Sequence, residues 1–355
     1  MFLRRLELFD LRNVKEAGLD LASGLNVFLG RNAQGKTTVL EGVGLVSRGR
    51  SFRSDDSRAA IRSGAERFLA RGLARNDSGR EATLELETSQ TTRSFRVDGR
   101  DVAPREYHGR LEVVVYSTER LRVVRGPMRE RRQFLDRGAS ALWPSYRQSL
   151  RDFERVLAQR NAALQSRARD LAVWSDRFVE LGASLRERRS AYAQRLNAAL
   201  DHGFRPQAEE YEVAVRLSPP SPEAAREELR TALVEMRAAE LAAGRSLVGP
   251  HRDAVALLVN GEEAADKASA GQARSLLLAL ALAALEIYRE ERGEAAVALL
   301  DDLDSELDEE RAEALCREVG GRGQALVTTA HPTWAERLRT QARLFNVEGG
   351  EVRAA

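Results

Sequence analysis

Lysine and cysteine are nearly absent from this chain of 355 residues. Cys316 is the single cysteine, so a disulfide within the chain is impossible, and we expect a reducing, cytoplasmic setting. The four histidines are scattered, which together with the lack of cysteine argues against a zinc site. No apolar run of membrane-spanning length stands out, and Glu7 and Asp10 follow the first residues too soon for a signal peptide. We therefore expect no membrane contact.

Arginine has replaced lysine almost everywhere, because only Lys15, Lys36 and Lys267 among the 56 basic residues are lysine. The net charge of +2 also conceals an asymmetry. Residues 121–200 carry 17 arginines against 8 acids, whereas residues 251–355 carry 12 basic against 20 acidic residues. Such a separation favours a polyanionic partner near the basic segment. A solvated helical surface would explain the same charges.

Residues 30–37, GRNAQGKT, match the phosphate-binding loop pattern called Walker A. An apolar stretch at 25–29 predicts a buried strand before the loop, and residues 38–43 open a helix after it. Curled backbone N–H groups and the helix N-terminus would face phosphate oxygens. Lys36 would reach the β- and γ-phosphates, and the Thr37 hydroxyl would hold Mg²⁺. The candidate ATP-binding residues here are Gly30, Arg31, Asn32, Ala33, Gln34, Gly35, Lys36, Thr37 and Thr38.

Residues 296–302, AVALLDD, form an apolar run that ends in two acids, which is typical of a Walker B strand. This pattern places Asp301 at the carboxyl end of a buried strand, so Thr37 and Asp301 are the predicted Mg²⁺ ligands. Asp302 lies beside it, where a carboxylate could orient an attacking water. Lys36, Asp301 and Asp302 are therefore the candidate catalytic residues. His331, after a predicted strand at 325–329, could bring a polar side chain to the γ-phosphate.

A small-residue loop at 267–272 precedes a leucine-rich helix predicted at 273–290. Ser269, Gly271 and Gln272 are candidate nucleotide contacts, because such loops bind phosphate at helix starts. The alternative is that Ser269 only caps the helix. Walker A, a long insertion, this signature loop and then Walker B is the order of an ABC-type ATPase, as in SMC and Rad50 heads.

The predicted fold is α/β: an ABC-type P-loop ATPase head with an added antiparallel sheet and an inserted helical arm. The head would comprise residues 1–122 and 246–355, and the arm residues 123–245. Strands are expected at 2–9, 24–29, 67–75, 82–87, 93–97, 111–116 and 255–259, those from 67 to 116 forming one meander. Helices are expected at 145–169 and 175–200, from residue 221 or 222, and from 305–308 through 318. Sustained heptads are missing, which favours a short arm over a long coiled coil.

The motifs resemble those of the RecF family. The resemblance is carried by residues 8–13 (LFDLRN), 30–37, 50–53 (RSFR), 116–121, 126–127, 131–136 (RRQFLD), 249–253 (GPHRD), 269–272 and 301–308. It covers nearly the whole chain, and RRQFLD and GPHRD are its most specific parts. Two residues depart from the family pattern: Ala33 stands where glycine is usual, and Ala254 where a second acid often follows Asp253.

The resemblance implies an ATP-dependent DNA-binding protein of replication and recombinational repair, active after DNA damage and in the SOS response. Such a protein helps to load the recombinase at single-strand gaps with RecR and RecO. It would bind duplex DNA and single-strand/duplex junctions as an ATP-dependent homodimer, in which the Walker A loop of one chain faces Ser269–Gln272 of the other. A weak, DNA-stimulated ATPase would act as the switch. The alternatives are an SMC-like structural tether, a metabolic phosphotransferase and, less favoured, a transporter subunit.

Overall fold

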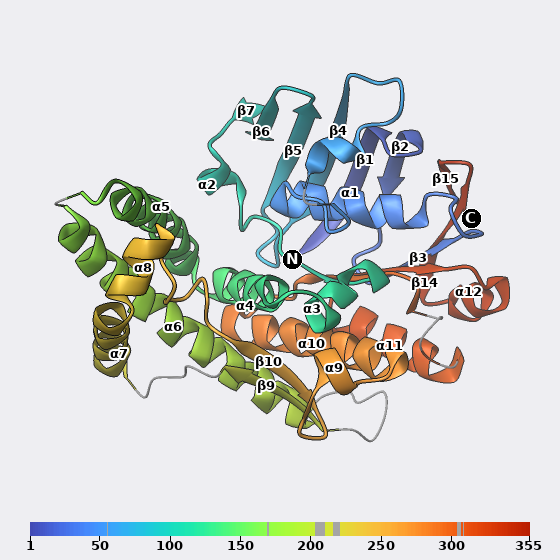
Figure 1. The fold of residues 1–355 in the computed structure, drawn as a ribbon. Helices are drawn as coiled ribbons and strands as arrows, with labels where there is room; N and C mark the ends of the chain where they lie inside the picture. Colours follow the sequence, from blue (N-terminus) through green and yellow to red (C-terminus); the bar gives the residue numbers. More distant parts are fainter. Residues whose placement is uncertain (55, 169, 203–209, 216–220, 304–306, 308) are drawn as a thin grey trace. The chain divides into compact units, whose positions relative to one another are not determined.

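The computed structural model describes residues 1–355 apart from 55, 169, 203–209, 216–220, 304–306 and 308 (Figure 1). The chain divides into two compact units. The head unit comprises Met1–Leu121 and Leu277–Ala355. The arm unit comprises most of the chain between them, up to Leu276.

A mostly parallel sheet of six strands forms one layer of the head unit, in the order β15-β14-β3-β13-β12-β8. Its central strands are mostly apolar and are buried almost throughout, as expected for a parallel sheet covered on both faces. Phe28 of β3 stacks on Phe345 of β14 with ring centroids 4.9 Å apart. The strands are β3 (Leu25–Leu29), β8 (Val113–Tyr116), β12 (Val297–Leu300), β13 (Ala325–Thr329), β14 (Ala342–Glu348) and β15 (Glu351–Ala354).

A second, antiparallel sheet of the head unit has the order β2-β1-β4-β5-β6-β7. Helix α1 (Lys36–Arg48) contacts strands of both sheets, and a single apolar core joins the three elements. The Walker A helix is therefore enclosed between two sheets. The strands are β1 (Phe2–Leu11), β2 (Val14–Asp20), β4 (Arg67–Arg75), β5 (Glu81–Ser89), β6 (Arg93–Val97) and β7 (Arg100–Asp101).

Two expectations for these sheets were wrong. No strand was expected between those at 2–9 and 24–29, but this segment contains β2, which pairs antiparallel with β1. The strand predicted at 111–116 leaves the meander, because β8 pairs in parallel with β12 in the other sheet. The remaining head segments are the short helices η1 (Ser57–Ala60), α2 (Pro104–Tyr107) and η2 (Thr118–Leu121), with α11 (Glu309–Arg322) and α12 (Pro332–Leu338). The helix start predicted at 305–308 falls largely outside the described residues.

Helices dominate the arm unit, and α6 contacts both α5 and α7. Helix α7 starts at Pro222, one of the two predicted start residues, and Ser221 caps it by accepting a hydrogen bond from the Ala224 N–H at 3.1 Å. A small sheet in the order β11-β10-β9 completes the unit. Its elements are α3 (Arg122–Arg125), α4 (Met128–Leu142), α5 (Pro144–Ser166), α6 (Leu171–His202), β9 (Tyr211–Val215), α7 (Pro222–Glu235), α8 (Arg237–Ala243), β10 (Val255–Val259), β11 (Glu262–Glu263) and α9 (Ala264–Lys267).

The return from the arm lies later than the predicted residue 246, since residues 246–276 group with the arm unit. Strand pairing explains the difference, because β10 forms a ladder with β9 of the arm. Arg131 of α4 also donates to the Val255 carbonyl at 3.2 Å. Helix α10 (Ala270–Arg292) therefore begins in the arm unit and continues into the head unit.

Helix α10 is the one described helix that is long and apolar enough to cross a membrane by length and composition. The sequence predicts this helix at 273–290 as a leucine-rich segment, but not as an apolar run of membrane-spanning length. Within the protein, 56% of its most apolar window is buried. A core helix passes the same test, so its apolar residues are explained by packing.

Candidate nucleotide-binding site

The Walker A loop, residues 30–37, leaves the carboxyl end of β3 and runs into α1. Lys36 is the first residue of that helix, and its side chain folds back over the loop. Its Nζ donates to the Gly30 carbonyl at 2.7 Å and to the Arg31 carbonyl at 3.2 Å. The ammonium group is thus held within the curl of the loop, where phosphate oxygens could replace the carbonyl oxygens.

Ala33 has a left-handed backbone, with φ of 65°. A residue with a Cβ atom pays an energetic cost in this region, whereas glycine does not. This geometry explains why glycine suits the position at which the sequence departs from the family pattern. The loop keeps the conformation with alanine, so other contacts must hold it in place.

Asp301 follows β12 and meets the Walker A loop from across β13. Its Oδ1 accepts hydrogen bonds from Thr37 Oγ1 at 3.1 Å and from Thr328 Oγ1 at 2.8 Å. Burial raises the pKa of Asp301 to about 6, the Thr328 bond opposes the shift, and the charge of Asp302 adds to it. The predicted pair Thr37 and Asp301 is therefore brought together in one place.

The donor set suits Mg²⁺, which prefers hard oxygen ligands and takes few of them from protein. Thr37 supplies a hydroxyl and Asp301 a carboxylate within hydrogen-bonding distance of each other. A buried carboxylate with a raised pKa is one that a cation would stabilise in its charged form. The residues therefore fit the metal predicted from the sequence.

Asp302 has a left-handed backbone with φ of 51° and a half-buried side chain. Its N–H donates to Thr328 Oγ1 at 2.9 Å, so Thr328 bonds to both acids of the Walker B segment. His331 is exposed and is the N-cap residue before α12, and its N–H donates to Thr329 Oγ1 at 2.9 Å. Strained backbone at an acid beside the loop is a common feature of functional sites.

A buried carboxylate behind the loop was missed by the sequence analysis. Glu41 of α1 is fully buried and accepts two bonds from Arg12, at 2.9 and 3.1 Å. Arg53 lies 3.4 Å from the same carboxylate and 3.0 Å from Glu119. Ser51 also donates to Glu41. This network explains why residues 8–13 and 50–53 accompany the Walker A motif, since both segments bind its helix.

The signature loop, residues 267–272, starts α10 in the arm unit. Ser269 Oγ accepts from the Gln272 N–H at 3.1 Å, and Gln272 Oε1 accepts from the Ser269 N–H at 2.8 Å. This reciprocal pair is a capping box. The capping alternative for Ser269 is thus realised within the chain, while Ser269 and Gly271 remain exposed to solvent.

Four arginines of the basic segment are buried in the arm unit and bonded to acids. Arg186 pairs with Asp253 at 2.7 and 2.8 Å, and Arg160 lies 2.6 Å from Glu240. The other two pairs are Arg189 with Asp136 and Arg131 with Glu263. The sequence spacing of Arg151, Arg155 and Arg160 predicts that they share one DNA-facing helix side, but the burial of Arg160 excludes it from such a side. Part of the positive charge of residues 121–200 therefore stabilises the arm internally.

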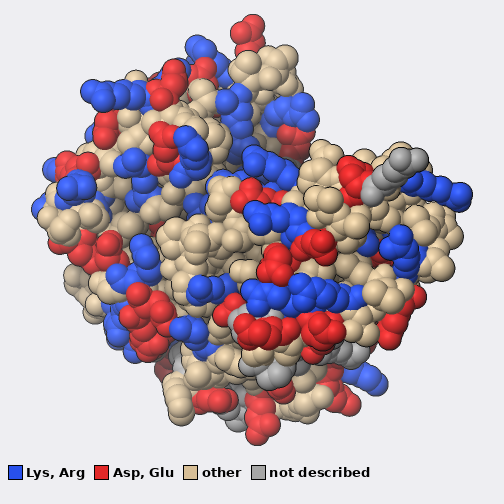
Figure 2. Space-filling view, turned by 90° about the vertical axis from the view of Figure 1, so that its left-hand side faces the viewer, with Lys and Arg blue, Asp and Glu red and all other residues tan. Residues whose placement is uncertain are grey.

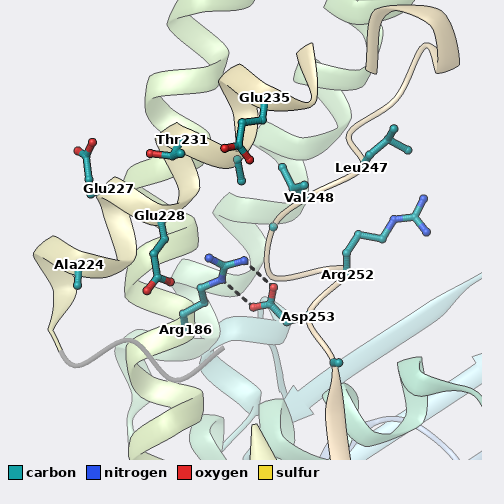
Figure 3. A pocket seen from close by; sticks show the side chains of 13 residues that line it. Arg186, Ala224, Glu227, Glu228, Thr231, Glu235, Leu247, Val248, Arg252 and Asp253 are labelled. Atoms are coloured by element: carbon teal, nitrogen blue, oxygen red, sulfur yellow. Dashed lines mark hydrogen bonds and ion pairs between the residues drawn. The ribbon is translucent and has the colours of Figure 1, made fainter. Parts of the chain in front are cut away.

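A pocket of about 790 Å³ lies within the arm unit, between α7 and residues 247–254 (Figure 3). The Arg186–Asp253 pair lies in its wall. Glu227, Glu228 and Glu235 of α7 line the opposite side. These acids would repel phosphates, so the pocket does not suit a nucleotide.

Figure 2 shows that basic and acidic side chains are intermixed over the face in view.

Comparison with known proteins shows which family the chain resembles. Residues 2–353 match the family described as the RecF/RecN/SMC N terminal domain. A DNA replication and repair protein RecF from Synechococcus sp. (strain JA-3-3Ab) is 35% identical over 99% of this chain and 97% of its own length. The chain belongs to the RecF family. The RecF protein of Listeria innocua serovar 6a is 32% identical over 99% of this chain and 100% of the relative.

Solved structures agree with this assignment. The recombination mediator protein RecF-ATP in the RecFOR pathway is similar with a TM-score of 0.90 and 27% identity, covering 100% of this chain and 97% of that chain. An SMC head bound to the C-winged helix domain of ScpA has a TM-score of 0.57 at 14% identity, covering 100% and 97%, which shows the fold alone. The predicted RecF resemblance and ABC-type ATPase fold are confirmed.

Proposed function

We propose that this chain is an ATP-dependent DNA-binding protein of replication and recombinational repair. The observation that carries the proposal is the 3.1 Å hydrogen bond between Thr37 of the Walker A loop and Asp301 after β12. These residues are far apart in sequence, and their meeting assembles a metal–phosphate site. RecF relatives over the full length, one of them solved with ATP, support ATP as the nucleotide.

Each residue has a distinct task in this proposal. Backbone N–H groups of residues 30–38 and the α1 N-terminus bind phosphate oxygens. Lys36 exchanges its carbonyl partners for the β- and γ-phosphates. Thr37 and Asp301 hold Mg²⁺, which supplies charge neutralisation at the phosphates. Asp302 accepts a proton from the attacking water and orients it.

ATP would also join two copies of the chain. In this arrangement Ser269, Gly271 and Gln272 of one chain contact the γ-phosphate bound to the other. The exposure of Ser269 and Gly271 at the start of α10 supports this, since both are accessible to a second molecule. Hydrolysis would then separate the two chains, so the weak ATPase activity would act as a switch between the associated and dissociated forms.

The proposed DNA targets are duplexes and single-strand/duplex junctions at gaps, where the protein assists recombinase loading in the cytoplasm with RecR and RecO. The support is the RecF relatives, one of them in a RecFOR pathway. The second candidate function is an SMC-like structural tether with little turnover. The similarity of the fold to an SMC head favours it only at the level of architecture.

Substituting Lys36 tests the proposal directly. Wild-type protein should bind ATP·Mg²⁺, increase in mass by light scattering, and hydrolyse ATP faster when gapped duplex is added. Lys36→Met should lose ATP binding and association together, because the phosphates lose their ammonium partner. The Lys15→Met variant, exposed on β2 and outside both the Walker A loop and the signature loop, is the matched control for loss of a lysine. Unchanged turnover in Lys36→Met would overturn the site, and association without DNA-dependent turnover would favour the tether.

A further inference from the structure

The turn between β14 and β15 is bonded to the Walker A loop. The Gly349 N–H donates to Gln34 Oε1 at 2.6 Å, and the Gly350 N–H donates to the Gln34 carbonyl at 2.9 Å. Asn13 Nδ2 donates to the same carbonyl at 3.1 Å. Gln34 is therefore held by three N–H donors from two segments outside the loop.

Backbone packing at this junction leaves no room for a side chain. A Cβ atom at Gly350 would lie 2.1 Å from the Asn13 carbonyl oxygen, and one at Gly30 would lie 2.2 Å from the Val347 carbonyl oxygen. Gly350 also has φ of 86°. The hairpin thus contacts the loop at its first residue through β14 and at Gln34 through the turn.

We propose that the β14–β15 turn is a positioning element for the nucleotide loop, a role that rests on the proposed ATP binding. The Gly350 N–H holds the Gln34 carbonyl and the Gly349 N–H holds the Gln34 side chain, which together fix Gln34 in the curled form of the loop before ATP arrives. The adjacent Ala33 is held in a left-handed conformation that is costly for alanine. Without the turn, the loop would relax and binding would include the entropy of ordering it again.

This role affects ATP affinity more than chemistry, because the turn acts through Gln34 and not on the reacting atoms. It also predicts a reciprocal effect. A contact that favours the ATP-binding conformation must itself be favoured by ATP. The amides of Gly349 and Gly350 should therefore exchange with solvent more slowly when ATP is bound.

Gly350→Ala tests the role, because the added Cβ must push the turn away from Asn13 and the loop. Gly99→Ala is the matched control: Gly99 also lies in a strand turn of the head unit, has φ of 76°, and has open space around its Cβ. Gly350→Ala should raise the Kd for ATP·Mg²⁺ by about 3- to 10-fold relative to Gly99→Ala. Turnover at saturating ATP should stay within about twofold of the control. Equal Kd values for two folded variants would overturn the role.

Hydrogen exchange of the wild-type protein gives a readout that does not depend on the folding of Gly350→Ala. Protection of the peptide that spans β14 and β15 should increase with ATP·Mg²⁺, and should not change in Lys36→Met. ATP binding with unchanged protection would overturn the positioning role while leaving the proposed function intact. Failure of the wild-type protein to bind ATP would overturn both.

Discussion

Asp301 shows the conflict between stability and function at a single residue. Its carboxylate is nearly buried, and burial raises its pKa from 3.8 to about 6. The charged form is therefore destabilised in the folded chain until a cation neutralises it. Because the folded-state pKa is the higher one, the contribution of Asp301 to the free energy of unfolding falls as pH rises from about 4 to about 6. The penalty is complete at neutral pH.

Asp301→Asn should separate these two effects. Asparagine keeps a hydrogen-bonding group beside Thr37 and Thr328 but carries no charge. The free energy of unfolding at pH 7 without nucleotide should rise by roughly 1–3 kcal/mol, and the pH dependence between 4 and 6 should flatten. Urea denaturation at pH 4.5 and 7.5 measures both changes.

The same variant should lose most of the increase in melting temperature that ATP·Mg²⁺ gives the wild type. Asp266→Asn, on the exposed side of α9, is a control for removal of a carboxylate. An Asp301→Asn protein that is less stable than wild type at pH 7 would show that the charge is already compensated.

Among the elements, those that carry the motifs could be predicted and those that join distant segments could not. The Walker A strand and helix, the Walker B strand and β13 all follow local apolar runs with clear ends. The strand β2 was missed because charged residues and Gly18 interrupt the alternation of its buried Val14, Ala17 and Leu19. The strand β8 was found but placed in the wrong sheet, since its partner β12 lies far along the chain.

The candidate site shows the same limit. Chain order predicted that Thr37 and Asp301 belong together, because the motif order of an ABC-type ATPase implies it. Nothing local predicted Glu41 as a buried anchor, since its partners Arg12 and Arg53 lie on opposite sides of it in sequence. Likewise, the turn that holds Gln34 lies at residues 349–350. It is too far from Gln34 in the sequence for a local pattern to predict the contact. The catalytic roles of Lys36, Asp301 and Asp302 remain predictions.

Helix α10 allows the two explanations of Ser269 to be separated, because the residue caps the helix within the chain. Aspartate and asparagine cap about as well as serine. Ser269→Asp should therefore keep the melting temperature, yet lose ATP-induced association, because its charge would face the γ-phosphate of a second chain. Ser269→Asn is the neutral control. Ser269→Arg should lose both association and, through the cap, about 0.5–2 kcal/mol of stability.

Light scattering with ATP and Mg²⁺, run beside thermal melts of the same samples, measures both quantities. If Ser269→Asp still doubles its mass on adding ATP, Ser269 only caps the helix. The proposed dimer, in which Ser269 of one chain contacts the γ-phosphate bound to the other, then loses its support. If it melts early, the capping geometry is not preserved and Ser269→Asn becomes the deciding variant.

For the whole molecule, segment charge is a poor guide to a DNA surface until burial is known. Residues 121–200 are strongly basic in sequence, but four of their arginines form ion pairs inside the arm unit. These are Arg131, Arg160, Arg186 and Arg189. Breaking such a pair leaves a buried charge without compensation, which costs about 3–5 kcal/mol. Arg160→Gln should therefore unfold the arm unit at a lower temperature, and its DNA binding would report stability rather than contact.

Arg155, which is exposed, and Arg151, which is partly exposed, give the informative experiment on α5. Arg155 has 76% of its side chain exposed, and Arg151 lies one turn earlier on the same helix. If both contact phosphates, Arg151→Gln/Arg155→Gln should reduce the slope of log Kd against log salt by about two units, one for each contact, with an unchanged melting temperature. Glu154→Gln on the same helix is the control and should not reduce the slope. An unaltered slope in the double variant would place the DNA contacts outside these two residues of α5.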